Sequence, residues 1–496
     1  MIAGSASGNL GDIVCQAPQA DGAYVDMATG QAYAMADIET AAARLAGGFA
    51  KRFKRGARVA IIANNGAPLT LSYLALMRAG LVAVPISYRL PAETIAYILE
   101  DSDCAAALIN DRYRDLLPPG FSVTALESDE FASLMAADPI APVTPEAGEL
   151  CEILYTSGST GRPKGVPLDH AGQLWALDLF VKATGDTPQT TIIVAPAYHM
   201  NGLFFTTVAL ALGWRTFSMP SFDPRAFLEL AAKERATMLS GIPTMFAMMA
   251  RQSDLLDTLD LSSVTAVTIG SAPLTQALID RVKSIFPKAM LRNSYGTTES
   301  GPAMFGPHPD GIDRPPLALG YPYPGVEWKL VDGSATEGKL LTRTPAVMNG
   351  YLNLPAVNAE RLNDGWYDTG DVVRLDDNGF FYFVGRADDM FVCGGENIYP
   401  GEIEKLLERH PAVLQAAVLP AEDEIKGQIP IAFIVRGEGA EVSAEEIKQF
   451  ALANGPAYAH PRAVVFLDTL PIGGTHKVDR SALKDAAKEA AMALGR

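Results

Sequence analysis

Residues 151–165 read Cys-Glu-Ile-Leu-Tyr-Thr-Ser-Gly-Ser-Thr-Gly-Arg-Pro-Lys-Gly, an apolar segment that runs directly into a loop of hydroxyl, glycine and basic residues. The apolar segment predicts a buried strand. Glycines let the backbone after it bend so that N–H groups converge on an anion, while hydroxyls add donors and lysine adds charge. We therefore predict a loop that binds the phosphates of a nucleoside triphosphate. Its candidate ligands are Thr156, Ser157, Gly158, Ser159, Thr160, Gly161 and Lys164.

This loop differs from the phosphate loop of Walker NTPases, in which glycine and lysine are adjacent at the start of a helix. Here Arg162 and Pro163 separate Gly161 from Lys164, and Pro167 follows before a helix can begin. The alternative is an ordinary surface turn. The combination of four hydroxyls, three glycines and a lysine after an apolar strand disfavours that alternative.

Residues 156–165 also resemble the T-S-G-S-T-G-x-P-K-G signature of the adenylate-forming superfamily, which includes acyl-CoA synthetases, peptide-synthetase adenylation domains and luciferases. Further motifs follow in family order over nearly the whole chain. The resemblance implies an α/β fold with a large N-terminal domain (1–387) of helix-covered, mainly parallel sheets plus a small β-barrel-like part. A small, mobile α+β C-terminal domain (388–496) would follow, with its hinge near Asp388.

Composition restricts the classes of protein to consider. The chain has 496 residues, of which 48% are hydrophobic and 20% charged, a profile that predicts a globular protein with at least two domains. A net charge of −17 disfavours a nucleic-acid partner. No apolar run approaches the roughly 20 residues of a membrane span, and the N-terminus lacks a signal-peptide pattern. Four cysteines lie far apart in the sequence, which favours a cytoplasmic location. They are Cys15, Cys104, Cys151 and Cys393.

The pattern of apolar segments predicts the order of the elements. Strands and helices alternate over residues 37–109 and again over 191–295, which indicates parallel sheets covered by helices. Residues 118–149 are rich in proline and acids and are expected to form a connector. Asp-Asn-Gly at 377–379 predicts a hairpin turn. The domain boundary is placed at 385–388, where polar and small residues separate two apolar strands.

Residues 293–299 follow a predicted strand, so they are expected outside the carboxyl end of a sheet, where such folds bind ligands. Tyr295 could stack on a purine and Thr298 could reach a phosphate. Glu299 is a candidate catalytic residue that, with Thr156, could help to hold Mg²⁺, because this ion takes oxygen ligands. A turn with a solvated glutamate is the alternative. In the family this segment binds nucleotide, which here implicates Asn293, Tyr295, Gly296, Thr297 and Thr298.

Two further segments match nucleotide-binding parts of the family. Residues 270–273 end a predicted strand with small side chains and resemble the adenine-binding segment; they are Gly270, Ser271, Ala272 and Pro273. Asp371 could accept hydrogen bonds from both ribose hydroxyls, and Arg386 could donate to the ribose or to a phosphate. Taken alone, an aspartate and an arginine at turns are more often simply solvated.

The C-terminal part carries two matches to the family. Gly394 and Gly395 allow close approach of a thin ligand such as the pantetheine arm of CoA. Cys393 stands where the family commonly has serine, and we interpret it as a packed residue. Lys477 matches the lysine that stabilises charge as a carboxylate attacks the α-phosphate. His476 replaces the usual glycine before it.

The acid-binding pocket is the part that the sequence indicates least clearly. His199 matches a residue beside the substrate carboxylate, where enzymes for α-amino acids have aspartate, so an amino-acid substrate is disfavoured. A buried core histidine is the alternative. The only arginines between His199 and Lys233 are Arg215 and Arg225, so a dicarboxylate such as malonate is also disfavoured. The other predicted pocket residues are Met200, Gly202, Phe204, Met245 and Met304.

Together these features predict an enzyme that joins a carboxylic acid to CoA through an acyl adenylate, using ATP and Mg²⁺. The expected acid is aromatic, of the benzoate or cinnamate type, or a medium-chain aliphatic monocarboxylate. One alternative acceptor is the thiol of a carrier protein on another chain. A nucleotide-binding sensor without activity is an alternative of another class, which Lys164, Glu299 and Lys477 disfavour. The oligomeric state stays open, with a homodimer as one option.

Overall fold

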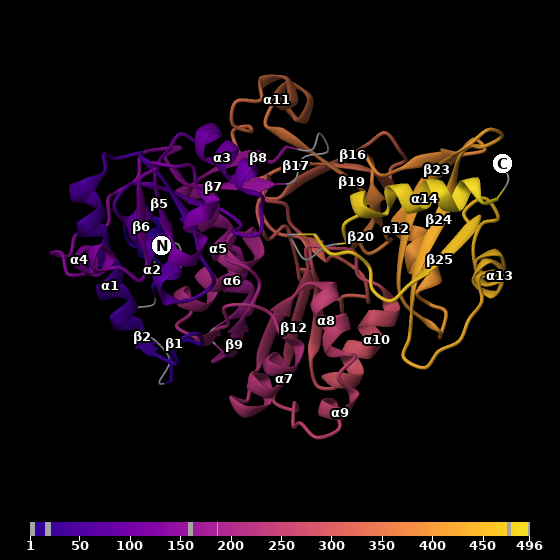
Figure 1. Ribbon diagram of the computed structural model, residues 1–496, viewed down its shortest axis with the longest axis horizontal. Coiled ribbons are helices and arrows are strands. Elements are labelled where there is room, and N and C mark those ends of the chain that lie inside the picture. The colour runs from indigo at the N-terminus through magenta and orange to yellow at the C-terminus, as the bar shows by residue number, and fades with distance from the viewer. Residues whose placement is uncertain (1–4, 15–20, 157–161, 186, 474–477, 495–496) are drawn as a thin grey trace.

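A computed structural model describes residues 5–14, 21–156, 162–185, 187–473 and 478–494 (Figure 1). Two mainly parallel sheets with flanking helices form the N-terminal part, a smaller antiparallel sheet follows, and a C-terminal lobe (residues 391–494) ends the chain. The predicted α/β fold is therefore confirmed. The division into domains at residues 387 and 388 stays a prediction. Within the described ranges, no helix combines the length and apolar character needed to cross a bilayer.

The first sheet contains the strand that leads into the phosphate-binding loop. Its neighbouring strands are parallel except for the last pair. In spatial order they are β6 (Val123–Ala125), β5 (Cys104–Ile109), β3 (Arg58–Ile62), β4 (Val82–Pro85), β7 (Leu150–Thr156) and β8 (Lys164–Asp169). The helices of this region are α1 (Met35–Arg52), α2 (Ala67–Arg78), α3 (Ala92–Asp101) and α4 (Asp129–Met135). Helices on both faces explain why β3 is almost entirely apolar and buried.

Two parts of this sheet were not expected. Strand β8 returns antiparallel to β7, so the phosphate-binding loop connects a hairpin. Pro167 is tolerated in β8 because β8 is the edge strand of the sheet. Residues 118–149 are more than a connector, since they contain β6 and α4. Ser128 caps α4 by accepting a hydrogen bond from Phe131 N, and the Phe131 side chain is buried.

The second sheet runs parallel from β13 to β1, with the short strand β2 antiparallel at its edge. In spatial order its strands are β13 (Met290–Ser294), β12 (Ala266–Gly270), β11 (Met238–Gly241), β9 (Thr190–Ile193), β10 (Arg215–Ser218), β1 (Ala23–Asp26) and β2 (Ala32–Ala34). The helices between its strands are α5 (His170–Thr184), α6 (Met200–Ala211), α7 (Pro224–Lys233), α8 (Pro243–Met249), α9 (Ser253–Leu256) and α10 (Gln276–Ile285). The five strands predicted between residues 191 and 295 are confirmed.

The third sheet is antiparallel and corresponds to the small β part that the resemblance implied. It contains β16 (Glu327–Val331), β17 (Glu337–Arg343), β18 (Leu362–Asn363), β19 (Trp366–Leu375) and β20 (Phe381–Arg386). Helix α11 (Pro355–Arg361) precedes β18. A separate pair of strands, β14 (Phe305–Gly306) and β15 (Tyr321–Pro322), lies earlier in the chain. The predicted turn at 377–379 joins β19 to β20. Asp376 Oδ1 accepts hydrogen bonds from Asn378 N and Phe380 N there.

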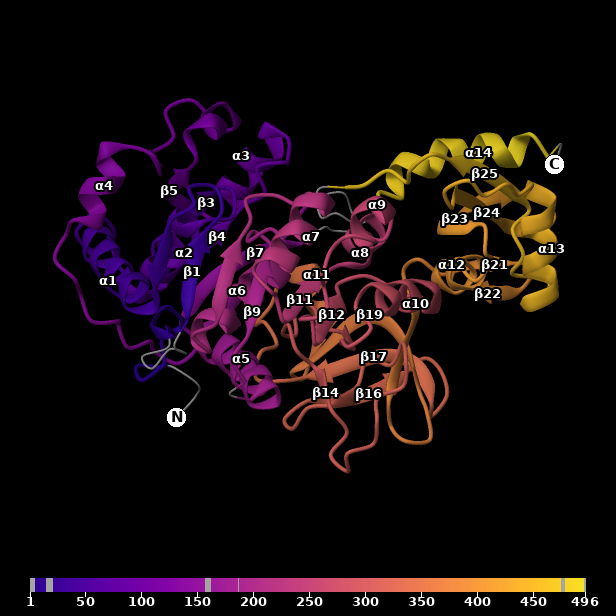
Figure 2. The ribbon, with the colours of Figure 1, turned by 90° about the horizontal axis from the view of Figure 1, so that it is seen from below.

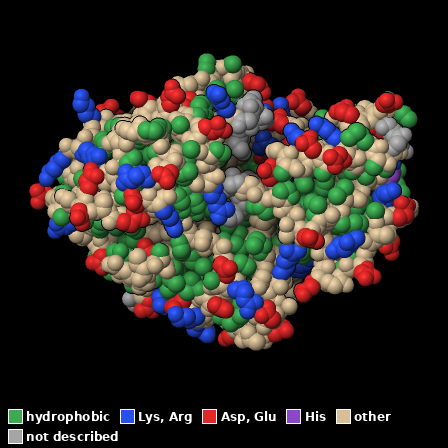
Figure 3. All heavy atoms as spheres, viewed as in Figure 1, with side chains coloured by type: hydrophobic (Ala, Val, Ile, Leu, Met, Phe, Trp, Pro, Cys, Tyr) green, Lys and Arg blue, Asp and Glu red, His purple; other side chains and the backbone are tan. Residues whose placement is uncertain are grey.

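The C-terminal lobe has its own buried core and lies beside the rest of the chain in both ribbon views (Figures 1 and 2). Its elements are β21 (Phe391–Cys393), β22 (Glu396–Ile398), α12 (Pro400–Leu407), β23 (Val413–Asp423), β24 (Gly427–Arg436), α13 (Ala444–Asn454), β25 (Ala463–Leu467) and α14 (Lys484–Met492). This matches the predicted α+β unit. Acidic and basic side chains are interspersed over the face of the molecule in Figure 3, so the net charge is not gathered in one patch there.

Candidate functional site

A cleft of about 930 Å³ lies between the N-terminal part and the C-terminal lobe. Its walls include the residues that follow β9, β11, β12 and β13. These strands are parallel neighbours, so their carboxyl ends meet at one edge of the sheet. Segments that are far apart in the sequence therefore converge on one site.

Strands β7 and β8, which flank the predicted phosphate-binding loop, reach this cleft. Thr156 and Lys164 are paired across the hairpin, and both line the cleft. The loop residues between them, Ser157, Gly158, Ser159, Thr160 and Gly161, lie outside the described residues. The two ends of the predicted loop are thus placed at the cleft.

Glu299 lies next to this hairpin and is only 8% exposed. Its Oε1 accepts hydrogen bonds from Tyr351 Oη at 2.9 Å and from Thr156 Oγ1 at 3.3 Å. A carboxylate and a hydroxyl so close together fit a hard cation such as Mg²⁺, which prefers oxygen ligands. The donor set therefore agrees with the predicted metal site.

Lys164 contributes positive charge beside this carboxylate. Its Nζ lies 4.5 Å from the centre of the Tyr351 ring. Burial lowers the pKa of Lys164, and the nearby charge of Glu299 opposes that effect. A partly desolvated ammonium interacts more strongly with an incoming phosphate than a solvated one does.

Two tyrosines at this point were missed from the sequence. Tyr351 Oη lies 3.2 Å from Tyr367 Oη, and both side chains are about 4% exposed. Burial, together with the charge of Glu299, raises the pKa of Tyr367 well above its usual range, so its hydroxyl stays protonated. Tyr351 therefore donates to Glu299 directly, and Tyr367 supports Tyr351 from behind. Tyr351 belongs to no local pattern that distinguishes it from a core tyrosine, whereas Tyr367 begins the segment 367–371 that ends at Asp371.

The two predicted base-binding segments are neighbours because β12 and β13 pair in register, with Gly270 opposite Ser294. Ser271 has φ +66°, a conformation that side chains rarely adopt and that occurs often at ligand sites. At Gly296 a Cβ atom would lie 2.5 Å from the Gly301 carbonyl oxygen, so only glycine fits. The residues of these segments that line the cleft are Gly270, Ser271, Ala272, Pro273, Asn293, Tyr295, Gly296, Thr297 and Thr298.

Asp371 is held from two sides at the cleft. Tyr295 Oη donates to Asp371 Oδ2 at 2.5 Å, and Arg386 Nη1 lies 3.1 Å from Asp371 Oδ1. The Tyr295 ring also packs against Phe305, with centroids 5.6 Å apart. Burial, and then the charge of Asp371, raise the pKa of Tyr295 well above its usual range. The sequence identified all three polar residues but not the hydrogen bond between Tyr295 and Asp371.

Asp388, the predicted hinge, also lines the cleft. Its Oδ2 lies 3.0 Å from Arg361 Nη2 and 3.5 Å from Arg386 Nη2. Both arginines belong to the N-terminal part, so this residue is tied to that part in the observed arrangement. Its role as a hinge stays a prediction.

The predicted acid pocket is placed in part. His199, Met200, Phe204 and Met245 line the cleft, but Gly202 and Met304 are not among its lining residues. A Cβ atom at Gly202 would lie 2.4 Å from the Ala195 and Pro196 carbonyl oxygens, so the close approach of this backbone requires glycine. Met304 is fully buried in the cluster with Phe305 and accepts a weak hydrogen bond from Ser300. The lining residues also include Tyr198, Asn201, Phe205 and Thr244.

The C-terminal lobe contributes the residues on either side of the predicted lysine loop. Lys477 itself lies outside the described residues, but Leu470, Val478 and Arg480 line the cleft. Ile472 and Val478 pair across the base of the loop. Arg480 Nη2 forms an ion pair with Glu404 Oε1 at 2.6 Å, which anchors the residues just after the loop.

Gly394 and Gly395 are placed differently. They form the turn between β21 and β22, with φ +61° and +91°, and are not among the residues that line the cleft. Gly394 N donates to Lys426 O at 2.9 Å within the lobe. In this arrangement described residues on either side of the predicted lysine loop line the cleft, whereas Gly394 and Gly395 do not.

Comparison with known proteins agrees with this site. Residues 14–352 match the family model for the AMP-binding enzyme, and residues 402–477 match that for the AMP-binding enzyme C-terminal domain. The chain belongs to the AMP-binding enzyme family. The matched ranges contain the phosphate-binding loop, Glu299 and the lysine loop, and the prediction of an adenylate-forming enzyme is confirmed.

Several members of the AMP-binding family are similar over most of their length. A feruloyl-CoA synthase from Amycolatopsis sp. is 30% identical over 469 residues, covering 90% of this chain and 93% of the relative. A fatty acid–[acyl-carrier-protein] ligase from Streptomyces coeruleorubidus is 31% identical over 435 residues, covering 82% of both chains. The crystal structure of ATP-bound MatB from Rhodopseudomonas palustris is similar with a TM-score of 0.87 and 26% identity, covering 97% of this chain and 99% of that one.

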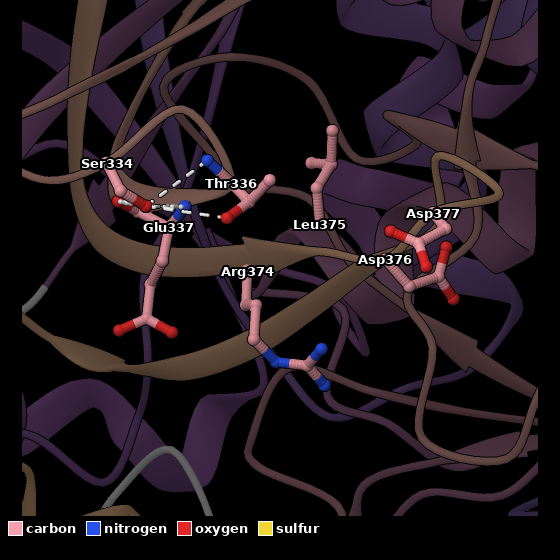
Figure 4. Close-up of a pocket in the computed structure, with 7 residues that line it drawn as sticks. All are labelled: Ser334, Thr336, Glu337, Arg374, Leu375, Asp376 and Asp377. Atoms are coloured by element: carbon pink, nitrogen blue, oxygen red, sulfur yellow. Dashed lines mark hydrogen bonds between the residues drawn. The ribbon is translucent and has the colours of Figure 1, made fainter.

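A second, more open depression of about 500 Å³ lies on the antiparallel sheet (Figure 4). Its polar groups serve the local turns: Ser334 Oγ accepts hydrogen bonds from Thr336 N and Glu337 N, as the dashed lines in Figure 4 show. None of the described residues that line it belongs to the predicted site. The lining residues are Ser334, Thr336, Glu337, Arg374, Leu375, Asp376 and Asp377. The cleft between the lobes therefore stays the candidate functional site.

Proposed function

We propose that this protein is an ATP-dependent carboxylic acid–CoA ligase that works through an acyl adenylate. The observation that carries the proposal is the single cleft in which Thr156, Lys164, Glu299 and Asp371 lie together with an apolar pocket. Leu470, Val478 and Arg480, from either side of the predicted lysine loop, line the same cleft. Polar groups for a nucleotide and apolar groups for an acid are both needed in one site for this reaction.

The first half-reaction joins the acid to AMP. A carboxylate oxygen of the acid attacks the α-phosphorus of ATP, the bond to the β-phosphate oxygen breaks, and pyrophosphate leaves. Lys164 and Lys477 would stabilise the negative charge that accumulates on the phosphates. Mg²⁺, held by Glu299 and Thr156, would neutralise phosphate charge.

The nucleotide is held by groups that the fold places in advance. The carboxylate of Asp371, fixed by Tyr295 and Arg386, would accept hydrogen bonds from the ribose hydroxyls. The small residues Gly270 and Ala272 leave room for the flat adenine base against the backbone. The protein thus contributes mainly positioning and charge stabilisation.

The second half-reaction transfers the acyl group to CoA. The CoA thiol loses its proton to water, its sulfur attacks the acyl carbonyl carbon, the bond from that carbon to the AMP oxygen breaks, and AMP leaves. Gly394 and Gly395 would let the pantetheine arm pass close to the backbone. Because they do not line the cleft in the observed arrangement, we propose that the C-terminal lobe rotates about Asp388 between the two steps.

The acid is proposed to be an aromatic or medium-chain monocarboxylate. Met200, Phe204, Phe205 and Met245 give the pocket an apolar, adaptable lining suited to such a body. The 30% identical feruloyl-CoA synthase favours the aromatic choice. A carrier-protein thiol in place of CoA is the second candidate acceptor, which the 31% identical acyl-carrier-protein ligase supports.

The proposal is tested with a panel of benzoates, cinnamates, C4–C12 aliphatic acids, alanine and malonate, each assayed with ATP, Mg²⁺ and CoA for AMP and thioester formation. We expect the aryl or medium-chain acids to give the highest kcat/KM. If AMP forms only when an acyl-carrier protein replaces CoA, the carrier-protein thiol is favoured as the acceptor. ATP binding without pyrophosphate release for any acid would instead indicate the inactive sensor.

A further inference from the structure

Helix α10 connects the N-terminal part to the C-terminal lobe through Arg281. Its guanidinium donates to two backbone carbonyls of the lobe, from Nη2 to Val413 O at 3.1 Å and from Nη1 to Leu414 O at 3.3 Å. These carbonyls lie at the start of β23. Both ribbon views place α10 beside the lobe at this point (Figures 1 and 2).

The N-terminal end of the same helix makes a second contact with the lobe. Thr275 caps α10, and its side chain also lowers the pKa of Glu408, the residue that ends α12. Glu408 Oε1 in turn accepts from Ala416 N at 3.0 Å. The pKa of Glu408 is raised to about 7, mainly by burial, although the hydrogen bond from Ala416 N and the charge of Arg281 act in the opposite direction. The carboxyl group is therefore shielded from water where the two parts meet.

Both contacts belong to one orientation of the lobe. In the orientation observed, Val478 and Arg480 line the cleft, whereas Gly394 and Gly395 do not. Arg281 is held to α10, while Val413 and Leu414 move with the lobe, so a rotation that brings the Gly394–Gly395 turn to the cleft must separate them. Contacts present in only one of two states shift the equilibrium between them.

We infer that α10 is a latch that holds the C-terminal lobe in the orientation for adenylate formation, with Arg281 as its positioning residue. The inference rests on the proposed two-step reaction. Arg281 is not among the described residues that line the cleft, so it would act through the lobe and not on a substrate. Its guanidinium is suited to the task because it offers several fixed donors to neighbouring carbonyls.

The kinetic test measures each half-reaction separately in Arg281→Ala. Hydrogen bonds from a charged donor stabilise the orientation in which the adenylate forms. Their loss should therefore slow acyl-adenylate formation from acid and ATP about tenfold. Attack of CoA on supplied acyl adenylate should stay at the wild-type rate or rise. Arg281→Lys, which keeps one charged donor, should restore part of the first rate. Lys283→Ala removes an exposed charge from the same helix and should change neither step.

The structural test measures the orientation of the lobe without any substrate. Dyes on cysteines introduced at the exposed positions Lys288 and Lys488 report the distance between α10 and the lobe by single-molecule energy transfer. Cys15 is replaced by serine for labelling, and Cys104, Cys151 and Cys393 are buried. Arg281→Ala should move molecules away from the distance that dominates in the wild type.

The two tests distinguish the latch from the reaction. If the wild type forms no adenylate with any acid, the proposed function fails, and the distance distribution still decides the latch. An unchanged distance distribution in Arg281→Ala would overturn the latch. Equal losses in both half-reactions with a lower melting temperature would also overturn it, because Arg281 would then support the fold alone.

Discussion

The hydroxyl of Tyr295 donates a hydrogen bond to Asp371 Oδ2 at 2.5 Å and so joins the segment after β13 to strand β19. Arg386 Nη1 holds the other oxygen of the same carboxylate at 3.1 Å. The carboxylate is thus fixed from both sides, although its partners lie 76 and 15 residues away in the sequence. A group fixed before its ligand arrives loses less conformational entropy on binding.

Asp371→Asn is predicted to weaken ATP binding, because the neutral amide is a poorer acceptor for ribose hydroxyls and cannot pair with Arg386. Hydrogen bonds to charged groups contribute about 1.5–3 kcal/mol, so the KM for ATP should rise about 10- to 100-fold. Tyr295→Phe keeps the carboxylate of Asp371 and should raise the KM for ATP less. Steady-state kinetics with varied ATP measure both. Asp332→Asn, at an exposed turn, is the control. An unchanged KM in Asp371→Asn would remove this residue from the ribose site.

Glu299→Gln is predicted to raise the Mg²⁺ concentration needed for half-maximal adenylate formation. The amide keeps the shape and the hydrogen bond from Tyr351 but loses the negative charge that balances the ion. AMP formation is measured against Mg²⁺ at saturating ATP, with circular dichroism to check the fold. Glu93→Gln, on the surface of α3, controls for the lost charge. The same Mg²⁺ dependence in Glu299→Gln and the wild type would contradict a metal role.

Much of the fold could be predicted because strands buried on both faces of a parallel sheet are continuous apolar runs. Strand β8 was not predicted because Pro167 and Lys164 make it unlike a central strand. Its place at the edge of the sheet permits these residues. Helix α4 was missed because its single buried aromatic, Phe131, lies in a segment rich in acids and prolines.

The candidate site was predictable where its residues cluster in short motifs, as around Lys164 and Glu299. Tyr351 and Tyr367 were not predictable, because their only distinction is the tertiary contact that each makes near Glu299. Met304 has the apolar character of a pocket residue and is buried elsewhere. Composition therefore indicates which residues suit an apolar pocket, but only packing decides which of them line it.

Glu152 makes stability depend on pH. It is 1% exposed, accepts a hydrogen bond from Tyr73 Oη at 3.0 Å, and has its pKa raised to about 7 by burial. The folded state therefore holds this proton more tightly than the unfolded state, whose carboxyl ionises near 4.5. Stability should fall as the pH rises from about 4.5 to about 7, by roughly 3 kcal/mol for this group.

Glu152→Gln is predicted to remove that part of the pH dependence, because the amide does not ionise. The unfolding free energy of the variant, relative to that of the wild type, should therefore increase from pH 5 to pH 8. Urea denaturation at both pH values measures it, and comparing differences cancels groups common to both proteins, such as Glu408. Parallel pH profiles for the two proteins would show that Glu152 does not titrate in this range.

Lys477→Ala is predicted to separate the two half-reactions. Val478 and Arg480, which follow Lys477 in the sequence, line the cleft, and we therefore expect Lys477 to act on ATP in this orientation. Losing one preorganised cationic donor costs about 10²–10³ in rate, so adenylate formation should slow by that factor, while CoA attack on supplied acyl adenylate stays near the wild-type rate. His476→Gly, which restores the family's residue, should change both steps little. Single-turnover kinetics of each step provide the comparison. Equal losses in both steps would contradict rotation of the lobe, because Lys477 would then serve the fold or one fixed arrangement.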